Sequence, residues 1–255
     1  LSGQRFVDVT AQSQLKLQND PMGCIVADYD CDGRLDLYVL YQHGKPPPPG
    51  EPMPWVGDDK TGAENELWRN EGNGVFRNVT AVAHAGGGRR HSFAAAWFFY
   101  DDDRFPDLYI ANDFGENVLL RNRGDGTFED VSQGSGTTGF ATSMGVTTGD
   151  LDNDGRPEIY VANMYSKMGR RIIAHVGPQD YPPGLFEQIK GSCAGNRLFR
   201  WSSGQGRYEE LSEPMGVNGV GWAYAPAMVD LDGDGWLDLY ATTGFLSFKR
   251  GKPDG

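Results

Sequence analysis

The stretch Asp230-Leu-Asp-Gly-Asp-Gly-Trp-Leu-Asp238, which runs directly into Leu239 and Tyr240, decides the fold. Three further stretches match it, namely Asp28–Asp36, Phe99–Asp107 and Asp150–Glu158. A second motif has an aromatic residue, then any residue, an acid or amide, Val or Leu, and Thr or Ser. It begins 22 or 23 residues before each acidic stretch, at Phe6, Phe76, Phe128 and Tyr208. A spacing that holds four times predicts a repeat protein.

A third motif, Asn-x-Leu-x-Arg, predicts hairpins. It starts at Asn65, Asn117 and Asn196, and a Gly-x-Gly turn follows it each time. Asn-Gly and Asp-Gly between alternating apolar residues favour tight hairpins. With strands such as Met22–Ala27 entering an acidic loop and Leu37–Tyr41 leaving it, each unit should contain four short antiparallel strands. The chain is therefore predicted to be all-β, a β-propeller of four-stranded blades.

Composition agrees with this fold and narrows the classes of function. The 36 glycines and 15 prolines favour turns and short strands over long helices. The net charge of −12 disfavours nucleic acid and anionic membranes as partners. The longest uninterrupted apolar run, Phe93–Tyr100, is too short for a transmembrane helix. Cys24, Cys31 and Cys193 show no CxxC spacing, so no disulfide framework can be read from them.

The acidic loops are predicted to bind calcium. Carboxylates at loop positions one, three, five and nine can surround one ion, and position seven can offer its backbone carbonyl. Loops one, three and four have the complete set: Asp28, Asp30, Asp32, Arg34 and Asp36; Asp150, Asp152, Asp154, Arg156 and Glu158; and Asp230, Asp232, Asp234, Trp236 and Asp238. Position six turns sharply and is Gly33, Gly155 or Gly235 in these loops.

Loop two departs from this pattern. It has Phe99 at position one and Arg104 in place of the glycine, while Asp101, Asp103 and Asp107 remain. Three complete calcium sites are therefore expected, together with a fourth, incomplete one.

EF-hands, zinc sites, magnesium sites and simple turns fit the loops less well than calcium sites do. An EF-hand needs a bidentate Glu at position twelve, where this chain has Val39, Val161 and Ala241. Zinc would require Cys or His among the ligands, and magnesium a stricter octahedron. One Asp-rich loop can be a simple turn, but turns do not need carboxylates at alternate positions in three loops in register.

These motifs resemble FG-GAP/VCBS repeats, the calcium-loop blades of integrin α-subunit propellers. The fuller pattern, with Gly124–Ser132, Ser143–Gly145 and Tyr160–Met164, resembles the cartilage-acidic-protein-like (ASPIC/UnbV) group of secreted proteins. The resemblance implies a calcium-bearing β-propeller, usually exported, that acts in recognition or adhesion without catalysis. Propellers of this kind have six or seven blades, whereas four acidic loops occur here.

Two arrangements of the blades would account for the four loops. Residues 1–255 form one domain, which is either a segment of a six- to seven-bladed ring or a closed four-bladed ring. In a closed ring, Phe248–Arg250 with Pro253–Gly255 would supply a third strand and Phe6–Thr10 a fourth. Insertions are expected at 42–64, a loop containing Pro46–Pro49, and at 163–195, with short helices at 170–176 and 185–190.

The predicted function is that of a non-catalytic module for protein interaction, adhesion or complex assembly outside the cytoplasm. Extracellular calcium sites are often weak, which favours a secreted, periplasmic or cell-surface location. The alternative is a carbohydrate-binding or carbohydrate-cleaving propeller of the lyase type, which would need a basic residue near the calcium or the propeller axis. The densest supply of such residues lies in the second insertion: Lys167, Arg170, Arg171, His175 and Lys190.

Overall fold

The computed structural model of the protein describes residues 5–18, 20–42 and 62–244. Within them, three four-stranded antiparallel sheets and one two-stranded sheet follow one another along the chain. The first sheet contains β1 (Gly23–Ala27), β2 (Asp36–Leu40), β3 (Glu66–Gly72) and β4 (Val75–Asn78). The second contains β5 (His91–Phe98), β6 (Asp107–Asp113), β8 (Val118–Asn122) and β9 (Phe128–Asp130). The third contains β11 (Ser143–Gly149), β12 (Glu158–Asn163), β13 (Arg197–Ser202) and β14 (Arg207–Glu210), and the fourth β15 (Ala223–Val229) and β16 (Asp238–Thr243).

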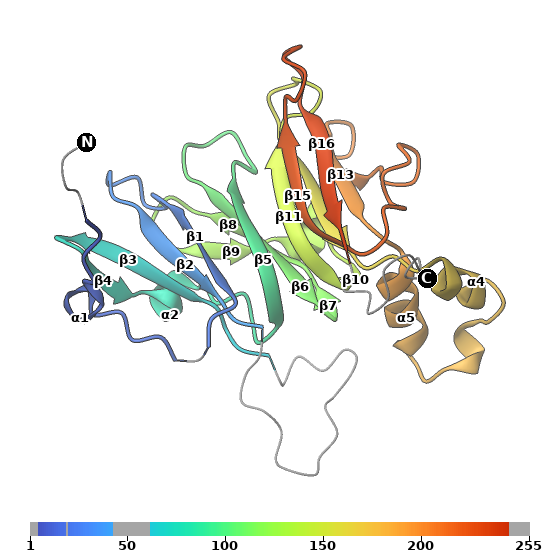
Figure 1. Cartoon of the computed structure of the whole chain (residues 1–255), viewed down its shortest axis with the longest axis horizontal. Helices are drawn as coiled ribbons and strands as arrows, with labels where there is room; N and C mark the ends of the chain where they lie inside the picture. Colours follow the sequence, from blue (N-terminus) through green and yellow to red (C-terminus); the bar gives the residue numbers. More distant parts are fainter. Residues whose placement is uncertain (1–4, 19, 43–61, 245–255) are drawn as a thin grey trace, which may run out of the picture.

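The sheets are the predicted blades, and each packs face to face on the next (Figure 1). The strands of blades one to three occur in the predicted order, and Asn73 and Gly74 make the first hairpin turn with positive φ. A second small sheet pairs β7 (Gly115–Glu116) with β10 (Phe140–Ala141), and so joins blade two to the start of blade three. The prediction of an all-β protein built from propeller blades is confirmed.

Strand β6 shows why the blades stack. Side chains of a strand alternate between its two faces, so successive residues reach opposite neighbours. Leu108 and Ile110 are buried in the core shared with blade one. Tyr109 and Ala111 are buried in the core shared with blade three. A strand covered on both faces needs apolar residues throughout, which explains the run Leu-Tyr-Ile-Ala after the acidic loop.

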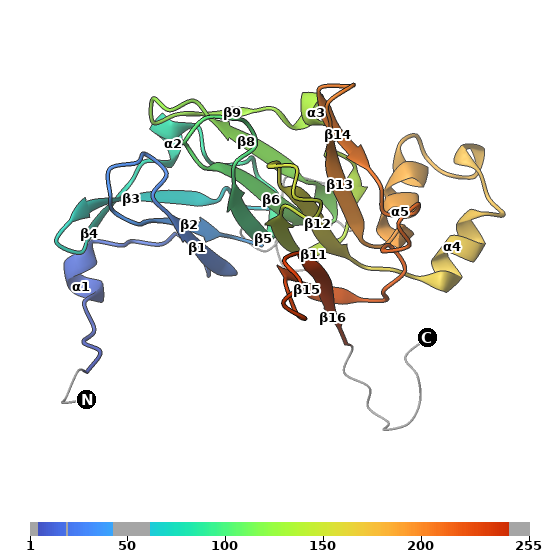
Figure 2. The same cartoon turned by 90° about the horizontal axis from the view of Figure 1, so that it is seen from above.

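The helices are short, and some were not predicted. α1 (Thr10–Ser13), α2 (Thr80–Ala83) and α3 (Ser132–Ser135) each follow the aromatic-x-acid motif as one turn. In the second insertion, α4 (Lys167–Ile173) and α5 (Leu185–Cys193) confirm the two predicted helices with shifted bounds (Figure 2). α4 starts earlier than expected because the Ser166 hydroxyl caps it by accepting a hydrogen bond from the backbone N–H of Gly169. A single 3₁₀ turn, Pro178–Asp180, lies between them.

None of the helices in the described ranges is long and apolar enough to span a membrane.

The blades form an open arc in the described residues, with β5 and β11 standing between β1 and β15 (Figures 1 and 2). Residues 5–9 form no strand, and Phe6 is fully exposed. The fourth strand that Phe6–Thr10 would give a closing blade is therefore not seen. In blades one to three this motif pairs with an Asn-x-Leu-x-Arg strand, and no described strand lies beside Phe6. Residues 248–250 and 253–255, and most of the insertion 42–64 including 46–49, lie outside the described residues.

Buried asparagine side chains form hydrogen bonds between the strands of one blade and also to the next blade. The Asn117 Oδ1 atom accepts hydrogen bonds from the backbone N–H of Asn112, at 2.8 Å, and from the Ser143 hydroxyl of blade three, at 3.0 Å. Asn65 repeats this arrangement with the Tyr41 N–H, and its Nδ2 donates to Ser92 Oγ of blade two. The first residue of the Asn-x-Leu-x-Arg motif is thus a polar connection between blades, a role that sequence reasoning missed.

Asp113, at the end of β6, is a buried carboxyl group away from the acidic loops. It is 4% exposed, the Gln42 amide donates to its Oδ2 atom at 3.4 Å, and its Oδ1 atom has no partner among the described residues. Burial raises the pKa of Asp113 to about 6.

We expect this group to make stability fall with rising pH. Because the folded pKa lies above the ordinary value, its stabilising contribution is complete below about pH 4 and is lost as the pH rises through about 6. The free energy of unfolding of Asp113→Asn, minus that of the wild type, should therefore be about 2 kcal/mol larger at pH 8 than at pH 4. Urea unfolding at both pH values measures this difference. The exposed Asp20→Asn serves as control, and an equal pH profile in wild type and Asp113→Asn would contradict the assignment.

Candidate metal-binding loops

The four acidic loops connect β1 to β2, β5 to β6, β11 to β12 and β15 to β16. Because each joins the first two strands of its blade in the same direction, all four lie at the same edge of the array (Figure 1). The predicted glycine turns are confirmed, since Gly33, Gly155 and Gly235 have φ values of +87°, +89° and +90°. Position four also has positive φ, at Cys31, Asn153 and Gly233, which the loop pattern did not predict.

The first carboxylate folds each complete loop. In loop one, Asp28 accepts hydrogen bonds from the backbone N–H groups of Asp32 and Gly33, both at 2.9 Å. Asp150 and Asp230 do the same in loops three and four. The loop backbone thus wraps around the position-one carboxylate in each of the three loops.

Three loops bring carboxylate oxygens close enough to share one cation. Ligand atoms lie within 4.8 Å of one another in each of three groups: Asp28, Asp30 and Asp32; Asp150, Asp152 and Glu158; and Asp230, Asp232 and Asp234. A calcium ion holds oxygens at about 2.3–2.6 Å, so two ligands on opposite sides of it are about 5 Å apart. The dimensions of the three groups fit that ion.

Several buried carboxylate oxygens in these loops have no hydrogen-bond partner among the described residues. They are Asp30 Oδ1 in loop one, and Asp152 Oδ1 and Glu158 Oε1 in loop three. Burial and the neighbouring Asp32 raise the pKa of Asp30. An unsatisfied buried carboxylate is costly, and a cation would relieve that cost in both loops.

The position-nine carboxylates connect each loop to the sheet. Asp36 accepts hydrogen bonds from the N–H groups of Tyr29, in the loop, and Asn70, in β3. Burial raises the pKa of Asp36 to about 6 and that of Glu158 to about 7. Of the predicted position-nine ligands, only Glu158 lies within a group of clustered oxygens, while Asp36 and Asp238 bond to loop backbone.

The acidic side chains of loop two form ion pairs and backbone hydrogen bonds instead of a cluster. Asp101 pairs with Arg121 at 2.6 Å, and both carboxylate oxygens of Asp102 accept from one terminal nitrogen of Arg156, in loop three, at 2.9 Å. Asp107 lies buried against backbone N–H groups, and burial raises its pKa to about 7. No cluster of metal-ligand atoms forms among its described carboxylates. Arginine charges thus neutralise this loop, which agrees with the incomplete ligand set.

The role of the arginine motif was also missed. In two of the three Asn-x-Leu-x-Arg strands the arginine reaches position three of the acidic loop, since Arg121 pairs with Asp101 and Arg200 with Asp152 at 3.1 Å. Arg69 of the first strand pairs with Glu71 at 2.8 Å instead. The available signal was the register of the motif strand against the strand that leaves the acidic loop, because this register fixes where the arginine lies. Ser and Thr of the aromatic motif have a fixed role as well, since Ser132 Oγ accepts from the Leu119 N–H of the neighbouring strand.

The basic residues considered for a lyase lie away from the acidic loops. Lys167, Arg170 and Arg171 belong to α4, His175 follows it, and Lys190 belongs to α5, all after the carboxyl end of β12. Loop three precedes the amino end of the same strand. Strand β12 has six residues, so about 20 Å separates the two ends. Arg170 pairs instead with Glu213 at 3.4 Å.

The fold and the loops define an array of propeller blades with acidic β-hairpin loops. Residues 100–161, from the second acidic loop to the third blade, match the model of the FG-GAP-like repeat. The chain is also similar to Cartilage acidic protein 1 of Homo sapiens, with 28% identity over 171 residues, and of Xenopus tropicalis, with 28% over 176 residues. The resemblance seen in the motifs is confirmed. The match covers 54% of this chain and 26% of the human relative, so the chain spans about a quarter of that protein.

Proposed function

We propose that this chain is a calcium-loaded part of an adhesion-type β-propeller that works outside the cytoplasm as a protein-interaction or assembly module. The observation that carries the proposal is the clustering of carboxylates in loops one, three and four, with buried oxygens left unpaired in loops one and three. The likeness to Cartilage acidic protein 1 and the FG-GAP-like repeat supports the adhesion class.

Calcium would act on the shape of one edge of the molecule. With ions bound, the carboxylates of each loop no longer repel one another, and the loops become fixed extensions of their hairpins. Four loops at one edge then present a rigid surface to a partner.

We expect isothermal titration calorimetry to give three calcium ions per chain. Asp30→Asn, Asp152→Asn and Asp232→Asn should each lower the stoichiometry by one, because each removes a position-three ligand from one cluster. Asp103→Asn is the matched control, since it lies in loop two and should leave the stoichiometry unchanged.

Dissociation constants of about 10⁻⁴–10⁻³ M would agree with an extracellular module. Absence of calcium binding would contradict the proposal as a whole, and sub-micromolar affinity would remove the argument for location. Calcium-dependent cleavage of an acidic polysaccharide, abolished by Arg170→Ala, would favour the lyase alternative over it.

A further inference from the structure

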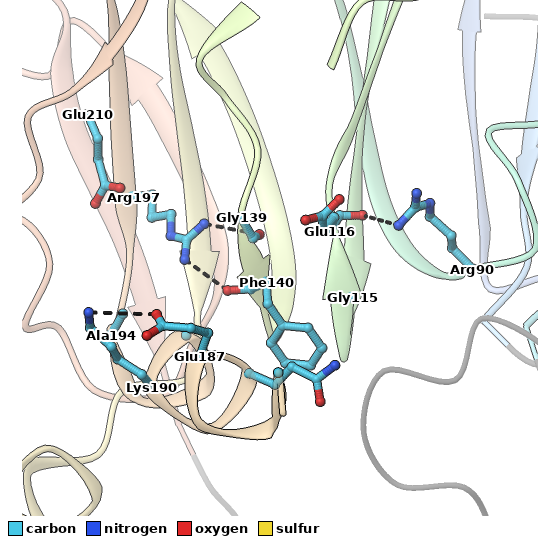
Figure 3. A pocket seen from close by; sticks show the side chains of 13 residues that line it. Arg90, Gly115, Glu116, Gly139, Phe140, Glu187, Lys190, Ala194, Arg197 and Glu210 are labelled. Carbon is cyan, nitrogen blue, oxygen red and sulfur yellow. Dashed lines mark hydrogen bonds and ion pairs between the residues drawn. The ribbon is translucent and has the colours of Figure 1, made fainter. Parts of the chain in front are cut away.

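A cavity of about 700 Å³ lies at the base of the interface between blades two and three, at the opposite end of the strands from the acidic loops. The small sheet of β7 and β10 forms one side and helix α5 the floor (Figure 3). Its volume lies within the range of small-molecule sites. Neither the acidic loops nor the proposed calcium sites contribute to its lining.

Arg197 is a buried cation in the wall of this cavity. The residue is 8% exposed, and its guanidinium donates to the backbone carbonyls of Gly139, at 3.1 Å, and Phe140, at 2.9 Å. These bonds use two of its five N–H donors, and Arg197 makes no ion pair with a described carboxylate, although Glu210 lines the same cavity. A buried charge without a counter-charge is unfavourable, so this position favours an anion in the cavity.

The backbone is shaped to hold the guanidinium in place. A Cβ atom on Gly139 would lie 2.7 Å from an Arg197 terminal nitrogen, and one on Gly191 would lie 2.2 Å from the Phe140 carbonyl oxygen. Glycine at these two positions lets β10 lie close both to the arginine and to α5. The geometry around Arg197 is therefore specified by several elements together.

Arg90 forms the opposite wall in the same way. Its guanidinium donates to the Glu116 backbone carbonyl at 3.2 Å, again with no carboxylate partner among the described residues (Figure 3). Lys190, on α5, adds a third cation, 3.8 Å from Glu187. Two arginines without an ion-pair partner among the described residues thus line one cavity in a protein with a net charge of −12.

The remaining lining offers hydrogen-bond acceptors and one aromatic ring. The Glu116, Glu187 and Glu210 carboxylates and the Gln188 amide belong to the lining, and the Phe140 ring lies in the cavity beside α5. Hydroxyl groups both donate and accept hydrogen bonds, so they suit a site that mixes arginines with carboxylates. These carboxylates repel a negative charge, so an anionic group is favoured only at the arginines, and uncharged hydroxyls suit the positions beside the carboxylates.

We propose that this cavity binds a small carboxylate that also carries hydroxyl groups, of the uronic-acid type. The ligand carboxylate pairs with Arg197, its hydroxyls bond to Glu116 and Gln188, and its apolar face lies against Phe140. This assignment does not depend on calcium in the loops.

The test is binding of galacturonate, measured by ligand-observed NMR and calorimetry in constant calcium. We expect a dissociation constant of about 1 mM for a ligand of this size, with galactose at least about tenfold weaker because it lacks the carboxylate. Arg197→Gln should weaken galacturonate at least about tenfold, and the melting curve shows whether this variant is folded. Arg207→Gln is the matched control on the neighbouring strand and should keep the wild-type affinity.

A second variant keeps the test decisive if Arg197→Gln unfolds. Arg90→Gln removes the half-buried cation of the opposite wall and should weaken galacturonate severalfold without changing galactose. The proposal is overturned by no galacturonate binding at tens of millimolar, by equal binding of galactose, or by wild-type affinity in both arginine variants.

Discussion

Transfer of the protein from 1 mM calcium into chelator lowers its melting temperature by roughly 10 °C. Each site with a dissociation constant of about 0.1 mM would contribute about 1.4 kcal/mol at that calcium concentration. Three such sites give about 4 kcal/mol, and a chain of this size gains about 2–4 °C per kcal/mol. The physical reason is the close approach of carboxylates in loops one, three and four, which Arg34 and Arg200 neutralise only in part by pairing with Asp32 and Asp152.

Matched variants separate this effect from a general loss of charge. Asp152→Asn removes a ligand with a buried unpaired oxygen and should reduce the calcium-dependent shift by about a third. Asp125→Asn makes the same chemical change in the exposed β8–β9 turn and should leave the shift intact. Identical melting curves in calcium and in chelator would rule out calcium as a structural ion.

Asn117→Ala lowers the free energy of unfolding by about 2–4 kcal/mol. The substitution leaves the Asn112 N–H buried without an acceptor and removes the bond to Ser143 of the next blade. It also opens a small cavity at a position that is 2% exposed. The single O–H of Ser143 lies within reach of both Asn117 Oδ1 and Asn163 Oδ1, so in the variant it donates to Asn163, 2.8 Å away, and is not left unpaired.

Urea unfolding at constant calcium measures this effect. Gln133→Ala removes an exposed amide from the neighbouring turn and is expected to change stability by less than about 0.5 kcal/mol. Asn65→Ala, at the equivalent place in blade one, should behave like Asn117→Ala. A loss for Asn117→Ala as small as that of the control would show that the amide does not hold the blades together.

Much of the fold could be predicted from the sequence because it depends on short-range patterns. Strands Gly23–Ala27 and Asp36–Leu40 lie within or beside the ranges expected for them, because alternation and turn residues act within a few positions. The two helices of the second insertion were found for the same reason. The one-turn helices that follow the aromatic motif were missed although their signal is local too, since Asp8, Asn78 and Asp130 each accept a hydrogen bond from the N–H two residues on.

Other features could not be predicted, because they depend on contacts between residues far apart in the sequence. The pairing of Asp102 with Arg156 joins residues 54 positions apart, and it exists only because blades two and three stack. The cavity lined by Arg90 and Arg197 also needs two blades and an inserted helix to meet.

The sequence by itself determined the repeat, the blade-forming strands and the acidic residues of each loop, because spacing and turn chemistry are local properties of the chain. Which carboxylates of a loop cluster, which pair with arginine, and where a buried arginine has no ion-pair partner among the described residues follow only from the packing of the blades. Those outcomes depend on distances between blades and on burial, and neither is encoded at any single position.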